Sequence, residues 1–458
     1  MLNKTLNSKL ILSILATGLL AFSGIVVETA TNVTFPTLMK EFNVTTSSVQ
    51  WLTTGYLLVA SIMMPLSAFL KNNFTSKKLF TIAASLFAIG LLADALAPVF
   101  MVLVVGRVIQ GIGAGIALPL MFNIILEQAP QEKIGFLMGI GTLIIAIAPA
   151  VGPTFGGIIV DAFGWRSIFG SLIPVVIIAL IIGMFEIQQV TKPIKSTLDF
   201  LSVLYIAITF IGLIVGFSNL SKGLVYFLIP TLIGVIFLIL FIKRSNSIEK
   251  PLLNLKVLGN KLFRKHLVAF FLFQMAALGM SFILPNYIQL VNQKSALIAG
   301  LVVLPGAALG AIFAPLSGSL LDHLGARKPI IFGAFLQIIS MIIFSIFGKN
   351  LFVWSVLILY VIYMGGIGTS FDNTMTNGIG QLDKSDTANG NGLFNTVQQF
   401  AGAVGTSVIS AIVATSQSAN SGLSYAIKTA TGSQHAFIFL LILLILAGIL
   451  VNKATKAK

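Results

Sequence analysis

Long apolar stretches alternate with short polar segments along the whole chain. About 20 apolar residues in a helix cross the hydrocarbon core of a membrane, and fourteen stretches come close to that length. The pattern therefore predicts an all-α polytopic membrane protein with 14 transmembrane helices. The predicted spans are residues 10–34, 48–70, 79–97, 101–125, 134–159, 166–187, 198–218, 224–243, 267–290, 296–320, 329–347, 351–378, 392–416 and 434–452.

The composition agrees with this class and argues against several others. Of the 458 residues, 57% are hydrophobic and 9% are charged, whereas a soluble domain carries about 25% charged residues. The chain has no cysteine and only three histidines, far apart in sequence. We therefore expect no disulfide, no metal site and no cofactor, and we expect that the protein is not an enzyme. The first apolar run lacks a small-residue cleavage site, which predicts a retained span and not a signal peptide.

The distribution of positive charge predicts the orientation. A net charge of +15 would suit a nucleic-acid partner, but 21 of the 28 lysine and arginine residues fall on the side of the N-terminus. Because cytoplasmic loops are enriched in these residues, the charge predicts cytoplasmic termini and no nucleic-acid partner. The remaining residues are Lys40, Arg166, Lys222, Lys294, Lys349 and Lys428 on the other side, and Arg107 inside a span.

Two halves of the chain resemble each other. The glycine-rich segment GRVIQGIGAGIALPL, 106–120, is echoed by GIGTSFDNTM, 366–375, and internal repeats of this kind are typical of secondary transporters. We predict an N-terminal six-helix bundle over 1–190 and a C-terminal six-helix bundle over 267–458. Between them we expect two inserted transmembrane helices over 191–245 and a cytoplasmic linker over 246–266, lying along the membrane surface.

The segment APAVGPTFGG, 148–157, contains the densest cluster of helix-weakening residues. Proline removes a backbone donor and glycine loosens a helix, but in a membrane bundle small residues let backbones approach closely. We interpret Gly152, Pro153, Gly156 and Gly157 as a packed hinge between moving parts. The alternative is an ordinary membrane helix rich in glycine and proline.

Two charged residues fall inside the first half of the membrane domain. A charge at the bilayer centre costs about 2.5–3.5 kcal/mol, so each needs a reason. Glu28 and Arg107 both lie about seven residues from the predicted outer end of their spans, roughly 10 Å deep at about 1.5 Å per residue. They could meet across a cavity, or form a structural ion pair. A small, polar stripe surrounds the acid at helical spacing, consisting of Thr17, Ala21, Gly24, Glu28 and Asn32.

Asp372 is the candidate acid of the second half, since polar neighbours surround it in sequence. The alternative is an acid near a helix end that faces the cytoplasm. Four other acids fall near predicted span ends, where an interfacial position is the simpler interpretation; they are Asp94, Glu127, Asp161 and Glu186.

A carboxyl group in such a site can couple two fluxes. Burial disfavours its charged form and a nearby arginine favours it, so a balanced carboxyl group can exchange a proton or hold a cation instead. A proton moving inward through 100 mV releases about 2.3 kcal/mol, which can drive a solute outward.

The ninth span is rich in phenylalanine and also carries Gln274 and Met275. Phenylalanine and methionine suit a surface that repacks around different apolar ligands, although aromatic residues also face lipid. The amide of Gln274 is the better indicator of a cavity, because an amide is unfavourable against lipid.

Several segments together resemble the major facilitator superfamily and, within it, the fourteen-span drug:proton antiporters of Gram-positive bacteria. APAVGPTFGG is similar to the GPxxGG antiporter motif of span five. LVVGRVIQGIGAG, 103–115, is similar to the span-four motif, whose arginine corresponds to Arg107. VETATNVTFP, 27–36, resembles the span-one motif, whose acid, asparagine and proline correspond to Glu28, Asn32 and Pro36. QWLTTGYLL, 50–58, and GLFNTVQQFAGAVGT, 392–406, also resemble this branch.

The chain departs from the family at two places. The span-one acid is usually aspartate, and here it is the longer glutamate. The GxLaDrxGrr pattern after span two is replaced by SAFLKNNFTSKK, 67–78, which lacks the acid, whereas the second-half copy GSLLDHLGARK, 318–328, keeps Asp322, Gly325 and Arg327. We therefore expect an acid-based gating contact in the second half alone.

The resemblance implies two bundles that rock about a central cavity in the bacterial cytoplasmic (inner) membrane. It implies a monomer that exchanges protons for small amphipathic drugs, dyes or antiseptics, the cationic ones above all. Glu28 would carry the proton, Arg107 would tune it, and Asp372 would be a second proton or cation site. The substrate would contact Glu28, Asn32, Gln274, Met275 and Asp372. The hinge at 148–157 would pack on the second bundle near Gly300, Gly306 and Gly310.

Two alternatives remain open from the sequence. A narrow proton-coupled exporter of a single antibiotic, metabolite or lipid would have the same motifs. A membrane enzyme or channel should show clustered catalytic groups, a repeated filter or charged rings, and we find none of these in the sequence.

Overall fold

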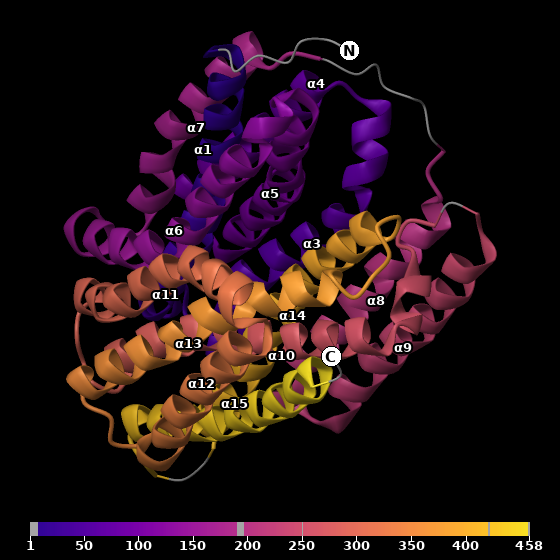
Figure 1. The fold of residues 1–458 in the computed structure, drawn as a ribbon. Helices are drawn as coiled ribbons and strands as arrows, with labels where there is room; N and C mark the ends of the chain where they lie inside the picture. The colour runs from indigo at the N-terminus through magenta and orange to yellow at the C-terminus, as the bar shows by residue number, and fades with distance from the viewer. Residues whose placement is uncertain (1–7, 190–196, 250, 420–421, 457–458) are drawn as a thin grey trace.

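The computed structural model describes residues 8–189, 197–249, 251–419 and 422–456. Within these residues the chain forms helices joined by short turns, and 14 of the helices are long and apolar enough to cross a membrane. The predicted fold class is therefore confirmed. Figure 1 shows two groups of helices, indigo to magenta and orange to yellow, packed against each other.

The N-terminal bundle contains six long helices. They are α1 (Ser8–Phe42), α3 (Trp51–Asn73), α4 (Ser76–Ala95), α5 (Phe100–Gln128), α6 (Gln131–Phe163) and α7 (Arg166–Glu186), with one short turn, α2 (Thr46–Val49), before α3. The C-terminal bundle also contains six. They are α10 (Lys261–Leu290), α11 (Ala296–Leu324), α12 (Arg327–Phe347), α13 (Val353–Ile379), α14 (Thr387–Gln417) and α15 (Tyr425–Thr455).

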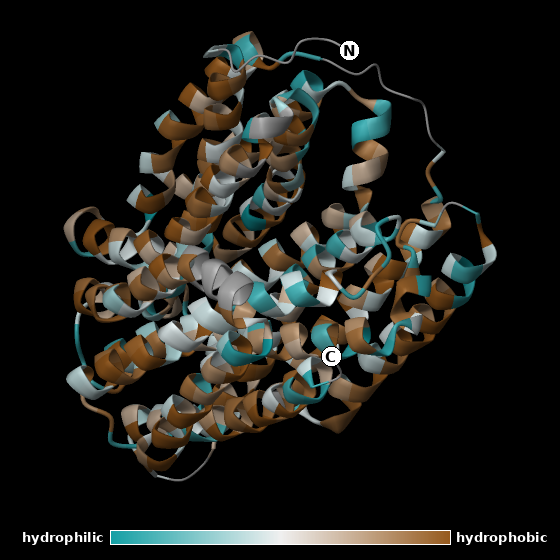
Figure 2. Ribbon diagram, in the orientation of Figure 1, coloured by the Kyte–Doolittle hydropathy of each residue, from teal (hydrophilic) through white to brown (hydrophobic). Residues whose placement is uncertain are grey.

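Two further helices, α8 (Phe200–Ser218) and α9 (Leu224–Ser247), lie beside the bundles as a close pair (Figure 1). A short turn, η1 (Leu220–Lys222), connects them. Gly212 and Gly216 of α8 meet the α9 backbone, and this close approach needs residues without a β-carbon. The ring of Phe210 stacks on Phe400 of α14 with centroids 4.3 Å apart. On the other side α9 exposes apolar side chains, which give it the brown colour in Figure 2 and suit contact with lipid.

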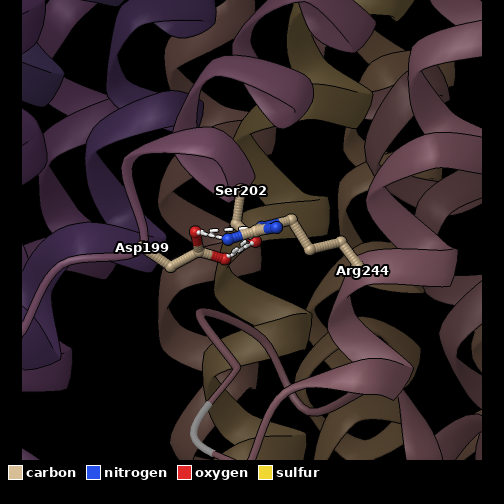
Figure 3. A network of polar contacts seen from close by, with 3 residues as sticks. All are labelled: Asp199, Ser202 and Arg244. Carbon is tan, nitrogen blue, oxygen red and sulfur yellow. Dashed lines mark hydrogen bonds and ion pairs between the residues drawn. The ribbon is translucent and has the colours of Figure 1, made fainter.

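An ion pair fixes one end of the inserted hairpin (Figure 3). Asp199, just before α8, accepts hydrogen bonds from the guanidinium group of Arg244 in α9, with the Nη2–Oδ1 pair 2.6 Å apart. Ser202 donates a further hydrogen bond to the same carboxylate. The bonds from Arg244 hold the pKa of Asp199 below its ordinary value of 3.8, because they favour its charged form.

The helices extend beyond several predicted spans. The first span was predicted to end at residue 34, but α1 continues to Phe42 and includes Lys40 and Glu41. Hydropathy marks where apolar side chains end, and a helix can continue as a polar turn beyond that point. Similarly, α10 begins at Lys261, inside the segment predicted as linker. The linker segment also packs into the protein, with Leu253 and Val257 buried.

The two bundles contact each other through the half of the molecule remote from the described chain ends. Thr46 donates a 2.6 Å hydrogen bond to Gln417, and Thr54 shares one of 2.9 Å with Thr406. Gln289 donates one of 2.8 Å to the carbonyl oxygen of Val33. In Figure 1, α6 lies beside α11 and α3 beside α14, the pairs that form this contact.

Candidate functional site

Glu28 lies in the middle of α1 and is nearly buried, with 8% of its surface exposed. No described residue hydrogen-bonds to its carboxyl group. The α1 backbone next to it is held closely, because Thr29 contacts Gly152 and Ala30 contacts Gly156 of α6. Glu28 is thus a carboxyl group with little water around it and no fixed hydrogen-bond partner among the described residues, which leaves it free to bind or release a proton.

Arg107, in α5, is completely buried. Its Nε donates to the carbonyl oxygen of Leu52 at 2.9 Å, and its Nη1 donates to Gln110 Oε1 at 2.6 Å. The guanidinium carbon lies 4.4 Å from the ring centroid of Tyr56, a favourable cation–π distance. The sequence suggested that Glu28 and Arg107 meet. The structure brings them within electrostatic range, but not into a hydrogen-bonded ion pair.

The acid linked to Arg107 by hydrogen bonds is Asp94, and here the interfacial interpretation was wrong. Asp94 is in the last turn of α4, near a span end as predicted, yet its side chain is completely buried. Its Oδ2 accepts a 2.7 Å hydrogen bond from Gln110 Nε2, so Gln110 connects the acid to the arginine. The reason is orientation: Asp94 faces the Gly106 position of α5, where no side chain stands in its way.

The glycine and proline residues of α6 make two different contacts. Gly152 and Gly156 face α1, whereas Gly157 lies against the backbone of Ala296 and Leu297 in α11. A β-carbon at Gly157 would lie 2.5 Å from the Ala296 oxygen, so this approach needs glycine. The segment therefore packs between α1 of its own bundle and α11 of the other.

Three glycines of α11 were expected to pack against the 148–157 segment of α6, and one of them does. Gly300 contacts Pro153, and its carbonyl oxygen accepts a 3.1 Å hydrogen bond from Thr154. Gly306 and Gly310 instead pack on Tyr360 and Met364 of α13. The prediction was wrong for these two because α11 turns them toward its own bundle.

A cavity of about 250 Å³ lies where the two bundles meet. Most of its wall comes from α10, α11, α13 and α14, with α6 and Thr29 of α1 on the opposite side. Among the described residues that line it, Asp372 is the single charged group, amid apolar residues such as Phe371 and Met364 and the polar Gln274 and Gln398. An apolar pocket with one carboxylate and a few amides can hold an amphipathic cation.

The structure places the other predicted substrate contacts outside this lining. Met275 is buried, and its backbone packs on Gly405 of α14. Asn32 is also buried, where it accepts a 2.7 Å hydrogen bond from Thr53 and donates one of 3.3 Å to Ser281 of the other bundle. Asn32 thus joins the bundles. Glu28 lies next to Thr29, one residue from the cavity wall.

The predicted gating residues lie at the end of α11. The side chain of Asp322 is outside the described residues. Gly325 has a φ of +74°, which favours glycine and allows the sharp connection to α12. Arg327 donates a 3.2 Å hydrogen bond to Asn452 of α15, a contact within its own bundle.

Sequence reasoning missed Asp161 as a contact between the bundles. Its Oδ2 accepts a 3.0 Å hydrogen bond from the backbone nitrogen of Leu297. Leu297 is in the first turn of α11, where backbone N–H groups have no partner within the helix and favour a negative charge. The sequence shows that Asp161 lies near the end of a span. It does not show that the first turn of α11, which Asp161 caps, lies beside it.

Two bundles with a cavity between them define a membrane carrier, and comparisons with known proteins agree. Residues 17–406 match the Major Facilitator Superfamily, and the chain belongs to this family of transporters. It is 36% identical to the lincomycin resistance protein LmrB of Bacillus subtilis (strain 168), over 95% of this chain and 93% of that protein. It is 26% identical to a multidrug resistance protein B homolog of Mycobacterium tuberculosis (strain ATCC 25618 / H37Rv), over 84% and 73%.

A solved structure supports the fold independently of sequence. A bacterial homolog of the human lysosomal transporter Spinster, in an inward-facing and unoccupied conformation, aligns with a TM-score of 0.73 at 13% identity. The alignment covers 99% of this chain and 98% of that one.

Proposed function

We propose that this transporter exports amphipathic drugs, dyes or antiseptics, cationic ones above all, in exchange for protons. The observation that carries the proposal is Asp372, the single carboxylate among the described residues that line an apolar cavity between two bundles. A carboxylate in an apolar wall attracts a lipophilic cation, and the cation and a proton compete for it. The lincomycin and multidrug resistance relatives support export of drugs.

In this proposal Glu28 carries the coupling proton. Its burial, its lack of a hydrogen-bonded partner among the described residues and the nearby Arg107 suit an acid that is alternately charged and neutral. The protein works as a monomer in the cytoplasmic membrane of a bacterium, with both termini in the cytoplasm. Rocking of the bundles about α6 and α11 exposes the cavity to one side and then the other.

The test is proton release from proteoliposomes on addition of ethidium, a permanently charged cation. The intact protein should release protons, and Glu28→Gln should abolish the release. Glu186→Gln, at the end of α7, is the matched control and should behave like the intact protein. Normal proton exchange by Glu28→Gln would remove Glu28 from the mechanism and transfer the role to Asp372.

A narrow exporter of one antibiotic is the second candidate, because three relatives of 35–36% identity are named lincomycin resistance proteins. It would respond to lincomycin and not to ethidium or other lipophilic cations. Transport of both classes would exclude it.

A further inference from the structure

Asp94 is a buried acid that the proposed function does not use. Its Oδ2 is hydrogen-bonded to Gln110, while its Oδ1 has no hydrogen-bond partner in the described part of the chain. Through the Gln110 amide it is connected to Arg107 Nη1, and Arg107 Nη2 likewise has no hydrogen-bond partner among the described residues. The same arginine is within electrostatic range of Glu28. Two acids therefore share a single buried cation.

The charges of these three groups do not balance when both acids are ionised. Arg107 contributes one positive charge, and ionised Glu28 and Asp94 contribute two negative charges. A buried net charge is unfavourable, so the set is most stable when one of the two acids is protonated. Whether Glu28 is protonated then depends on the charge at Asp94.

The other polar and charged groups near Asp94 and Arg107 do not change this charge balance. Tyr56 of α3 contacts Arg107 with the face of its uncharged ring. Toward the end of α4, Arg166 of α7 donates to the carbonyl oxygen of Ala97, but it is neutralised by Glu41 of α1 at 2.8 Å.

The C-terminal bundle contains a neutral copy of this arrangement. Gly90 and Gly106 pack closely between α4 and α5, and Gly333 and Gly366 do so between α12 and α13. Four residues after these glycines, the first bundle has Asp94 and Gln110 joined by a hydrogen bond. At the same offsets the second bundle has Gln337 and Ser370, also hydrogen-bonded, at 2.8 Å. The helix packing therefore does not require an acid at this position.

We propose that Asp94 is a positioning residue for proton coupling: acting through Gln110, it offsets the charge of Arg107 and thereby sets the pH at which Glu28 exchanges its proton. The inference rests on the proposed proton-coupled function. It assigns to the acid at the end of α4 a role that its neutral counterpart, Gln337, cannot have.

The experiment compares Asp94→Asn with the intact protein in proteoliposomes, measuring the initial rate of ethidium transport as a function of pH. Asparagine keeps the size and the hydrogen bond to Gln110 but removes the charge. Arg107 then favours ionised Glu28 without competition, so the midpoint of the pH profile should move to lower pH by about one unit. Asp94→Ser, smaller and also neutral, repeats the test if the asparagine variant is not stably produced. Gln337→Leu is the control and should leave the midpoint in place.

Each outcome has a definite meaning. A lower transport rate with an unchanged midpoint would assign Asp94 a structural role and overturn the inference. A shift in Gln337→Leu as large as in Asp94→Asn would also overturn it, since packing would then account for both. Suppose that ethidium triggers proton release in the intact protein, but Asp94→Asn and Asp94→Ser have the same midpoint of the pH profile as the intact protein. The inference about Asp94 then fails while the proposed function stands. If the intact protein shows no proton release and no pH dependence, the proposed function fails and the inference fails with it.

Discussion

In the proposed function, Asp372 is the residue that selects cationic substrates. Replacing it with asparagine keeps the shape of the cavity and removes the single charge among its described lining residues. We expect Asp372→Asn to weaken binding of ethidium by about tenfold or more, roughly 1.4 kcal/mol, and to change binding of neutral substrates much less. Fluorescence titration of the purified protein measures both. Asp383→Asn, an exposed acid beyond α13, is the control, and an equal loss for neutral and cationic ligands would contradict the prediction.

At this scale the sequence identifies charged residues inside the membrane spans better than it predicts their partners. Glu28, Arg107 and Asp372 stand out because charge is rare in apolar stretches. Asp94 was assigned to the interface, because hydropathy gives the depth of a residue and not the direction of its side chain. The Gln110 bridge depends on how α4 and α5 face each other, and a single sequence contains no direct record of that.

Among the elements, α6 is a helix whose packing against the other bundle depends on a missing β-carbon. A methyl group at Gly157 would meet the backbone of Ala296 and push α6 and α11 apart. We expect Gly157→Ala to lower the transport rate strongly. Gly170→Ala is the matched control, because nothing lies within 4 Å of its β-position in α7. There alanine should be neutral or stabilising, by up to about 1 kcal/mol. Transport and thermal unfolding of both variants test the prediction, and equal effects would contradict it.

The stability of the inserted hairpin of α8 and α9 should depend on pH through the ionisation of Asp199. Because Arg244 holds the folded-state pKa of Asp199 below 3.8, the ion pair stabilises the hairpin above that pH, and this stabilisation is lost as the pH falls through the folded-state pKa. Limited proteolysis of the loop before α8 should therefore be faster in Asp199→Asn than in the intact protein at neutral pH, and equal in strongly acidic solution.

The control for the hairpin is the double variant Asp199→Asn/Arg244→Gln. If the ion pair is responsible, adding the second substitution should change little. Proteolysis that does not differ between the intact protein and Asp199→Asn at neutral pH would show that the glycine contacts alone hold α8 to α9.

At the scale of the whole molecule, the sequence predicts the fold class and the number of spans but not which ends of the bundles touch. Span number follows from hydropathy, which each helix carries in itself. The contact between the bundles depends on pairs such as Thr54 with Thr406 and Asn32 with Ser281. These residues lie far apart in sequence, and their small polar side chains resemble many others in the chain.

The closed contact remote from the chain ends should be one of two states between which a carrier must alternate. The chain has no cysteine, so cysteines introduced at Thr46 and Gln417, whose Oγ1 and Oε1 atoms are 2.6 Å apart, can be joined by a short, reducible thiol-specific cross-linker without competing thiols. We expect cross-linking of Thr46→Cys/Gln417→Cys to lock the bundles together and reduce transport about tenfold or more, because alternating access needs this contact to open. A reducing agent should restore transport. The matched control shares one position: Gln417 Nε2 also donates a 3.0 Å hydrogen bond to Thr429 of its own bundle. Gln417→Cys/Thr429→Cys joined by the same reagent should therefore still transport. Full activity of the cross-linked Thr46/Gln417 pair would mean that the substrate crosses without separation of the bundles at this contact, and rocking about α6 and α11 would have to be abandoned.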